Sequence, residues 1–138
     1  FFLQSTVKEE MKFEKYFEKI LYVSFSPDSK TIVPSSFDGA IQLWDIYPCR
    51  EIQNMIGHLS GVEIVQYSPD CQMIVSSSTD KTIALWDIKS CARMKQLIVH
   101  PDVAKRVQFF PNGQFIVSCS FDKTVCLWDM KSGKKYSN

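Results

Sequence analysis

The stretch SSSTDKTIALWD, residues 76–87, places a run of hydroxyls, an acidic residue and a Trp-Asp pair close together, and His58 lies upstream of it. Serine, histidine and aspartate are the parts of a hydrolase triad, in which the imidazole takes the hydroxyl proton and the carboxylate orients the imidazole. The same residue types also form hydrogen-bonded networks that satisfy polar groups inside a fold. A catalytic triad occurs once in a chain, so the number of copies of this pattern decides between the two hypotheses.

The pattern is repeated, with a step of 42 residues. Residues 57–88 align on residues 99–130 without a gap, and 15 of the 32 positions are identical. The same step relates three sets of equivalent positions: Trp44, Trp86 and Trp128; Asp38, Asp80 and Asp122; and Pro27, Pro69 and Pro111. The chain is therefore a tandem repeat, a property to be recognised before any local motif is interpreted.

Each unit has the pattern of four short strands separated by turns. In the second unit, residues 62–67 alternate as a strand does, and the following Pro69 and Asp70 are typical of a turn. Residues 73–77 and 82–87 form the next two expected strands, and residues 92–98 the fourth. Because residues 82–87 are apolar on both faces, that strand must be covered on both sides. Four antiparallel strands per unit, stacked on copies of themselves, predict an all-β fold of the β-propeller type.

The chain resembles the WD40-repeat family, with Gly-His at 57–58 and Trp-Asp at 44–45, 86–87 and 128–129. This resemblance implies three four-stranded antiparallel blades, at residues 20–56, 57–98 and 99–138, the last with an incomplete outer strand. Since propellers typically have about four to eight blades, we expect these three to be part of a larger ring. Residues 1–19 match only weakly. Their segment 8–14 is one period before residues 50–56, and it fits either the outer strand of a preceding blade or an amphipathic helix.

The resemblance also implies a role for the Ser, His and Asp residues. In the family, a His before the first strand, a Ser or Thr ending the second, the turn Asp and the Trp form a buried hydrogen-bonded tetrad. The expected tetrads are His58, Ser78, Asp80 and Trp86 in the second unit, His100, Ser120, Asp122 and Trp128 in the third, and a partial set of Ser36, Asp38 and Trp44 in the first. Tyr16 stands where the first unit should have its His, and Pro34 interrupts the second strand of that unit. We therefore expect the pattern to be a structural brace, and the first blade to be the weaker one.

Several functional classes lack support in the composition and motifs. The net charge of +1 gives no strong field for nucleic acid. No apolar run approaches the roughly 20 residues that cross a bilayer. Neither a nucleotide loop, a metal-ligand cluster nor a nucleophile elbow is present, so we expect no catalytic, cofactor-binding or metal site. The five cysteines form no C-x-x-C and favour reduced thiols in an intracellular protein, cytoplasmic or nuclear, although Cys119 and Cys126 could face each other across a hairpin.

Binding residues are expected at the turns before each third strand. Phe37, Thr79 and Phe121 occupy equivalent positions there, and Lys81 and Lys123 follow two of them. Aromatic side chains are enriched in interface cores, so these tips are candidate protein contacts; alternatively, the two phenylalanines only pack against a neighbouring loop. Because WD40 domains mostly organise protein complexes, the resemblance implies an interaction scaffold for protein or peptide partners, which further WD repeats of the same or another chain would complete. A structural component of a large assembly is the alternative, and an enzyme is not expected.

Overall fold

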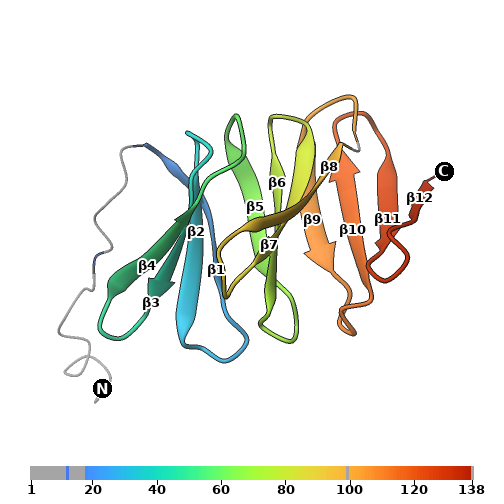
Figure 1. Ribbon diagram of the computed structural model, residues 1–138. Coiled ribbons are helices and arrows are strands. Elements are labelled where there is room, and N and C mark those ends of the chain that lie inside the picture. The colour runs from blue at the N-terminus through green and yellow to red at the C-terminus, as the bar shows by residue number, and fades with distance from the viewer. Residues whose placement is uncertain (1–11, 13–17, 99, 138) are drawn as a thin grey trace, which may run out of the picture.

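The computed structural model describes residues 12, 18–98 and 100–137, and these form three four-stranded antiparallel sheets. The sheets stand side by side in chain order (Figure 1). The first contains β1 (Ile20–Phe25), β2 (Thr31–Ser36), β3 (Ile41–Asp45) and β4 (Arg50–Met55). The second contains β5 (Val62–Tyr67), β6 (Met73–Ser78), β7 (Thr82–Asp87) and β8 (Arg93–Ile98). The third contains β9 (Ala104–Phe109), β10 (Phe115–Ser120), β11 (Val125–Asp129) and β12 (Lys135–Ser137).

This architecture confirms the expected all-β fold of propeller blades. Every strand pairs with its neighbour in sequence, as in a meander. The outer strand of the third sheet, β12, has three residues and pairs with Cys126, Leu127 and Trp128 of β11. The described residues include no helix with the length and apolar character needed to cross a membrane. The segment 8–14 lies outside the described residues, apart from Lys12, so the choice between strand and helix stays a prediction.

The hydrophobic core lies between the sheets. One cluster joins the first and second sheets through Val33, Ile41, Val65 and Trp86, among others. A second cluster joins the second and third sheets, as the strand patterns require, because both faces of β7 are covered. Burial depends on the neighbour: Ile41 and Ile83 are 0% exposed, whereas the equivalent Val125 of the third sheet is 60% exposed.

The first sheet is less regular than the second. In the second sheet, the β6–β7 register runs without a break over five residue pairs. Between β2 and β3 the register is present at Thr31, Ile32 and Ser35 but skips Val33 and Pro34. Proline has no N–H to donate to a ladder, which accounts for the gap at this position. That this sheet is also the less stable one stays a prediction.

The five cysteines are free thiols. Cys126 lies opposite Ser118 and is buried among the residues that join the second and third sheets, whereas Cys119 lies opposite Val125. Neighbouring positions of a strand point to opposite faces. The two thiols are therefore on opposite sides of the third sheet and do not face each other.

The contrast between Ile83 and Val125 gives a test of the packing. Ile83→Ala removes a fully buried side chain between two sheets and should lower the free energy of unfolding by about 2–5 kcal/mol. Val125→Ala changes the equivalent but exposed position and should alter it by no more than about 0.5 kcal/mol. Denaturant melts of both variants would check this. Equal losses would mean that the face of Val125 is covered in solution.

Candidate binding face

A chain of hydrogen bonds runs through the second sheet. The indole N–H of Trp86 donates to Ser76 Oγ at 2.8 Å, and Ser76 Oγ lies 2.7 Å from His58 Nε2. On the other side of the ring, His58 Nδ1 lies 2.9 Å from Asp80 Oδ2. One proton arrangement satisfies all four groups: Ser76 donates to Nε2 of a neutral imidazole, whose Nδ1–H donates to the Asp80 carboxylate.

The hydroxyl in this chain belongs to Ser76, so the expectation that Ser78 supplies it is wrong. Ser76 lies directly opposite Ala84, and Trp86 is two residues further along β7 on the same face, which places its indole within reach of Ser76. Ser78 is two residues away in the other direction. Its hydroxyl donates to the Ser60 carbonyl at 3.1 Å and accepts the Asp80 N–H at 3.0 Å, which ties the hairpin to the loop before β5.

The electrostatics of this network favour a neutral histidine beside a charged carboxylate. Burial lowers the pKa of His58, and the opposing effect of Asp80 does not overcome it. Burial would raise the pKa of Asp80, but hydrogen bonds from the Thr82 hydroxyl, the Leu59 N–H and His58 outweigh it and lower the pKa. The Thr82 N–H also donates to this carboxylate.

The third sheet repeats the arrangement with one difference. His100 Nδ1 lies 2.7 Å from Asp122 Oδ2, and His100 Nε2 lies 3.0 Å from Ser118 Oγ. Ser118 is the equivalent of Ser76, so here too the expected Ser120 is replaced by the serine two residues earlier, and Ser120 accepts the Asp122 N–H instead. The indole N–H of Trp128 has no hydrogen-bond partner among the described residues. Burial opposes ionisation of Asp122, but the Thr124 hydroxyl and N–H and His100 lower its pKa to about 2.

The first sheet satisfies its tryptophan differently. Pro34 occupies the position of Ser76, and Tyr16, at the position of the histidine, lies outside the described residues. The Trp44 indole N–H donates to Gln42 Oε1 at 3.1 Å, and Gln42 is itself buried. The sequence reasoning missed Gln42, although its position is held by Ala84 and Cys126 in the other units, so a polar residue there was a usable signal. Ser36 and Asp38 are hydrogen-bonded to each other, as the partial set implied.

The geometry of these networks suits bracing better than nucleophilic attack. Ser76 is fully buried, and the side chain of His58 is 1% exposed. A nucleophile must be reached by its substrate, and a hydroxyl that also accepts the Trp86 N–H is held inside the sheet. Within residues 12, 18–98 and 100–137, no three His, Cys, Asp or Glu side chains gather as metal ligands.

The networks hold together one face of the molecule, which we call the tip face: the β2–β3, β6–β7 and β10–β11 hairpins with the loops before β5 and β9. It is the upper edge in Figure 1. At each tip the backbone N–H donates to the segment before the inner strand: Phe37 to Lys19 O, Thr79 to Gly61 O, and Phe121 to Val103 O. Asp80 adds a bond to the Leu59 N–H, so hairpin and loop are fixed to each other.

The candidate contact residues take different positions on the tip face. Phe37 and Phe121 are both 60% exposed, and Lys105 Nζ lies 5.4 Å from the centroid of the Phe121 ring. Thr79 is half-buried, and its hydroxyl is hydrogen-bonded to Ser60 Oγ at 2.7 Å. Leu59, which the sequence reasoning missed, is 89% exposed. Its signal was an apolar residue directly after Gly-His in a loop.

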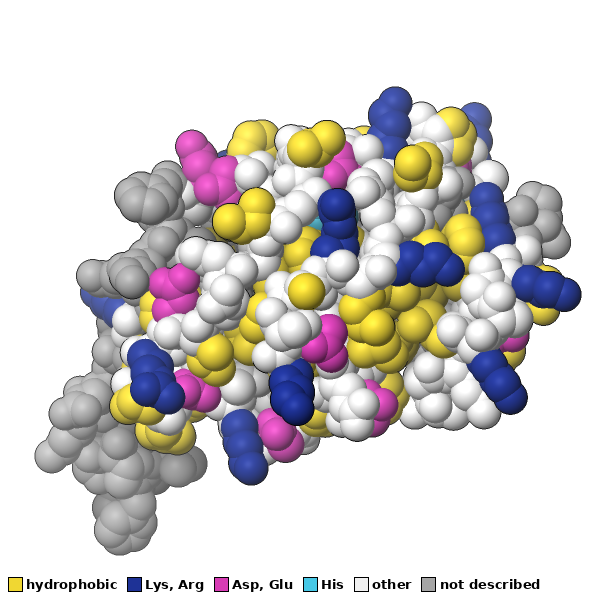
Figure 2. Space-filling view, viewed as in Figure 1, with side chains coloured by type: hydrophobic (Ala, Val, Ile, Leu, Met, Phe, Trp, Pro, Cys, Tyr) yellow, Lys and Arg dark blue, Asp and Glu magenta, His cyan; other side chains and the backbone are white. Residues whose placement is uncertain are grey.

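The two tip lysines are exposed and have left-handed backbone conformations. Lys81 has φ of 74° and Lys123 of 70°, and the equivalent residue of the first hairpin is Gly39, with φ of 91°. A Cβ at Gly39 would lie 3.0 Å from the His58 carbonyl oxygen, so the first hairpin lies close against the loop of the second sheet. On the side shown in Figure 2, Lys and Arg are interspersed with Asp and Glu at the lower left, and Lys and Arg predominate toward the upper right.

Serine substitutions at two neighbouring positions test the corrected network. Ser76→Ala leaves the His58 Nε2 and the Trp86 N–H unpaired in a buried site, which should cost about 1–3 kcal/mol for each group. Ser78→Ala removes bonds to backbone groups beside the exposed Ser60 and should cost about 0.5–1.5 kcal/mol. Urea unfolding measures both. A larger loss for Ser78→Ala would place the network on the other serine.

The shifted carboxylates and imidazole predict loss of stability in acid. The pKa of Asp122 is about 2 in the folded chain against an ordinary 3.8, so its contribution is present above pH 3.8 and is lost as the pH falls toward 2. The lowered pKa of His58 acts in the same direction below its ordinary value of 6.5. The free energy of unfolding should fall as the pH is lowered from 7 to 2. Asp122→Asn should make this fall less steep below pH 3.8. A flat profile would contradict both assignments.

Comparison with known families agrees with this geometry. A family model described as "WD domain, G-beta repeat" matches the chain three times in tandem, over residues 9–45, 49–87 and 92–129. These segments together make up more than half of the chain. None of the curated proteins compared with the chain matches it. The three matches and the three antiparallel sheets show that the chain belongs to the WD40-repeat family.

Proposed function

We propose that the chain is a protein-interaction scaffold whose tip face binds protein or peptide partners. WD40 repeats are generally interaction scaffolds, which gives the class. The observation that carries the proposal is the pair of exposed phenylalanines, Phe37 and Phe121, at equivalent hairpin tips. Aromatic side chains supply most of the energy of many interfaces when they insert into a partner's pocket.

Rigidity beneath the tips supports this function. A binding loop that is already ordered loses less conformational entropy when a partner binds. The second hairpin is held by Ser78 and Asp80, and the third by the equivalent Ser120 and Asp122. The tip residues themselves differ, so the backbone stays fixed while the side chains specify the partner. The Thr79 hydroxyl is already bonded to Ser60, so this residue contributes to the shape of the surface rather than a hydrogen bond to a partner. Lys81 and Lys123 add positive charge at the rim.

The second candidate function, a structural component of a larger assembly, is favoured by the two end faces of the row of sheets. Phe25 of the first sheet is 68% exposed, and Val125 of the third is 60% exposed. The equivalent residues of the second sheet, Tyr67 and Ile83, are 8% and 0% exposed because sheets pack on them. Further WD repeats, of the same or another chain, would cover these faces. The five free thiols fit a reducing compartment such as the cytoplasm or nucleus.

Alanine substitution at the two tips tests the binding face. Phe37→Ala and Phe121→Ala should each weaken the strongest partner captured from cell extract by about 1–3 kcal/mol, the usual range for an interface anchor. Their melting temperatures should change little, since both side chains are exposed. Dissociation constants measured with that purified partner, alongside thermal melts, give both quantities.

Tyr47 provides a matched control, because it is an aromatic residue with 81% exposure in the loop between β3 and β4, away from the tips. Tyr47→Ala should leave binding unchanged. If the two phenylalanine variants keep full affinity, or melt as early as a variant of the buried network, these rings are packing elements and the contact surface is elsewhere.

A further inference from the structure

The outer side of the third sheet has the chemistry of a sheet-packing surface. We call it the open face: Arg106, Gln108, Val117, Cys119, Val125 and Leu127. Arg106 lies opposite Cys119, and Gln108 lies opposite Val117, so these side chains project on one side of the sheet. The apolar members are the kind of residue that the other two sheets bury at these positions.

The equivalent face of the second sheet shows what covers such a surface. Ile64, Val75, Ile83 and Leu85 are buried in one cluster with residues of the third sheet. Val33, Ile41 and Leu43 of the first sheet are buried in the same way by the second. The interface is thus repeated, and a further sheet placed by the same step would cover the open face.

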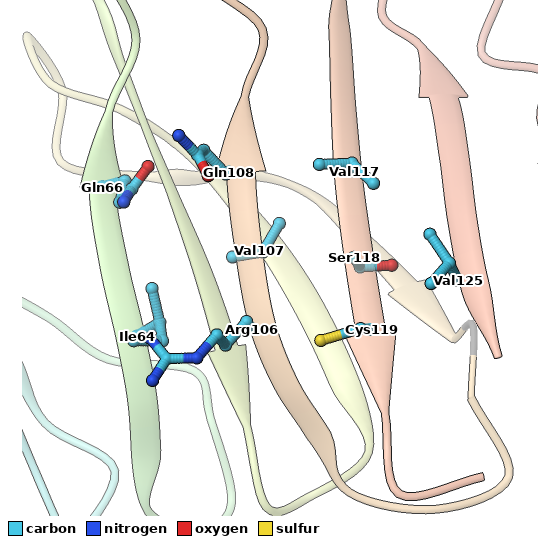
Figure 3. Close-up of a pocket in the computed structure, with 9 residues that line it drawn as sticks. All are labelled: Ile64, Gln66, Arg106, Val107, Gln108, Val117, Ser118, Cys119 and Val125. Atoms are coloured by element: carbon cyan, nitrogen blue, oxygen red, sulfur yellow. The ribbon is translucent and has the colours of Figure 1, made fainter. Parts of the chain in front are cut away.

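Arg106 departs from this pattern. It stands where the second sheet has the buried Ile64, and it is exposed. Among the described residues, no carboxylate lies within ion-pair distance of its guanidinium. Its side chain extends from β9 toward Ile64, and Cys119 and Val125 lie on the other side of β9 (Figure 3). All four residues line a cavity of about 270 Å³. A sheet that covers the open face must either leave this charge a path to water or supply an acceptor, because an unpaired buried charge is costly.

The position of such an acceptor follows from an ion pair between the second and third sheets. Lys105 Nζ lies 2.7 Å from Glu63 Oε2, and these residues are equivalent, one repeat apart. Side chains at this position of two neighbouring inner strands therefore lie within reach of each other. In the first sheet the same position holds Leu21.

We propose that the open face docks a further propeller sheet whose inner strand carries an Asp or Glu at the position equivalent to Glu63 and Lys105, and that this carboxylate pairs with Arg106. The proposal rests on the assembly role described above and names the chemistry of the partner. A second copy of this chain does not fit, because its exposed first sheet would present Ile20, Leu21 and Val23 to the guanidinium. The second repeat of this chain does fit, because it carries Glu63 and buries Val62, Val65 and Tyr67 on the side that docks.

The probe for the test is therefore a second copy of residues 55–98 joined after Asn138, which continues the 42-residue register. The readout is the alkylation rate of Cys119, which lies on the open face, measured by peptide mass spectrometry. Cys49, in the loop between β3 and β4 of the first sheet, serves as the internal control. In the extended chain, alkylation of Cys119 should slow by about tenfold or more relative to the 138-residue chain, while that of Cys49 should not change.

Charge reversal separates the carboxylate from general apolar packing. Changing Glu63→Lys in the appended copy only should restore fast alkylation of Cys119, and adding Arg106→Glu to that chain should protect the thiol again. Far-ultraviolet circular dichroism of each chain establishes that the sheets are folded. Rescue by Arg106→Glu is the decisive result, since loss of folding would not be rescued by a second charged substitution.

Three results would overturn the proposal. If Glu63→Lys leaves the protection of Cys119 unchanged, the face docks a sheet without needing a carboxylate. If Glu63→Lys removes the protection and Arg106→Glu does not restore it, the carboxylate pairs with a cation other than Arg106. Sedimentation of the unmodified chain well above 15.9 kDa, insensitive to Arg106→Glu and abolished by Val125→Glu, would make a second copy the occupant. Partner binding through Phe37 and Phe121 is measured independently of all three, so failure here leaves the tip-face function standing.

Discussion

The structure depends on the need of buried indole and imidazole groups to find hydrogen-bond partners. Trp86 is 1% exposed and His58 is 8% exposed, and neither could be buried at low cost with its polar nitrogens unpaired. Ser76 meets both demands with one hydroxyl, and Asp80 accepts a hydrogen bond from the remaining imidazole N–H. These four residues come from a loop, two strands and a hairpin, so satisfying them fixes those elements relative to one another. Hydrogen bonds from these elements thereby hold the second hairpin against the loop before β5.

The three repeats meet the same demand to different degrees. The second sheet has the complete network, and the third has the histidine, serine and aspartate but leaves the Trp128 N–H without a hydrogen-bond partner among the described residues. The first replaces the serine by Pro34 and satisfies Trp44 through Gln42, at the cost of two register pairs between β2 and β3.

The faces between the sheets are governed by apolar packing, and one ion pair, Lys105–Glu63, joins the second and third sheets at their inner strands. Apolar burial is not directional, so valine and isoleucine at these positions specify a neighbouring sheet but not its identity. Charged groups at an interface discriminate between partners, because a like charge or an unpaired charge is penalised. Glu63 and Lys105 provide such a contact between the second and third sheets.

The sequence by itself determined the repeat, the four strands of each unit and the equivalence of the three tip positions. It could do so because a 42-residue period and two-residue alternation are properties of the chain. It did not determine which serine bonds to the tryptophan. Ser76 and Ser78 point to the same side of β6, and only the register with β7 places Ser76 beside Trp86. Gln42 stood out in the sequence as a polar residue at an apolar position, but only the structure shows that it accepts the Trp44 N–H. The sequence also did not show that Ile83 is buried while the equivalent Val125 is exposed. These outcomes depend on which surfaces meet in space, and identical local patterns are buried or exposed according to the neighbour that tertiary structure supplies.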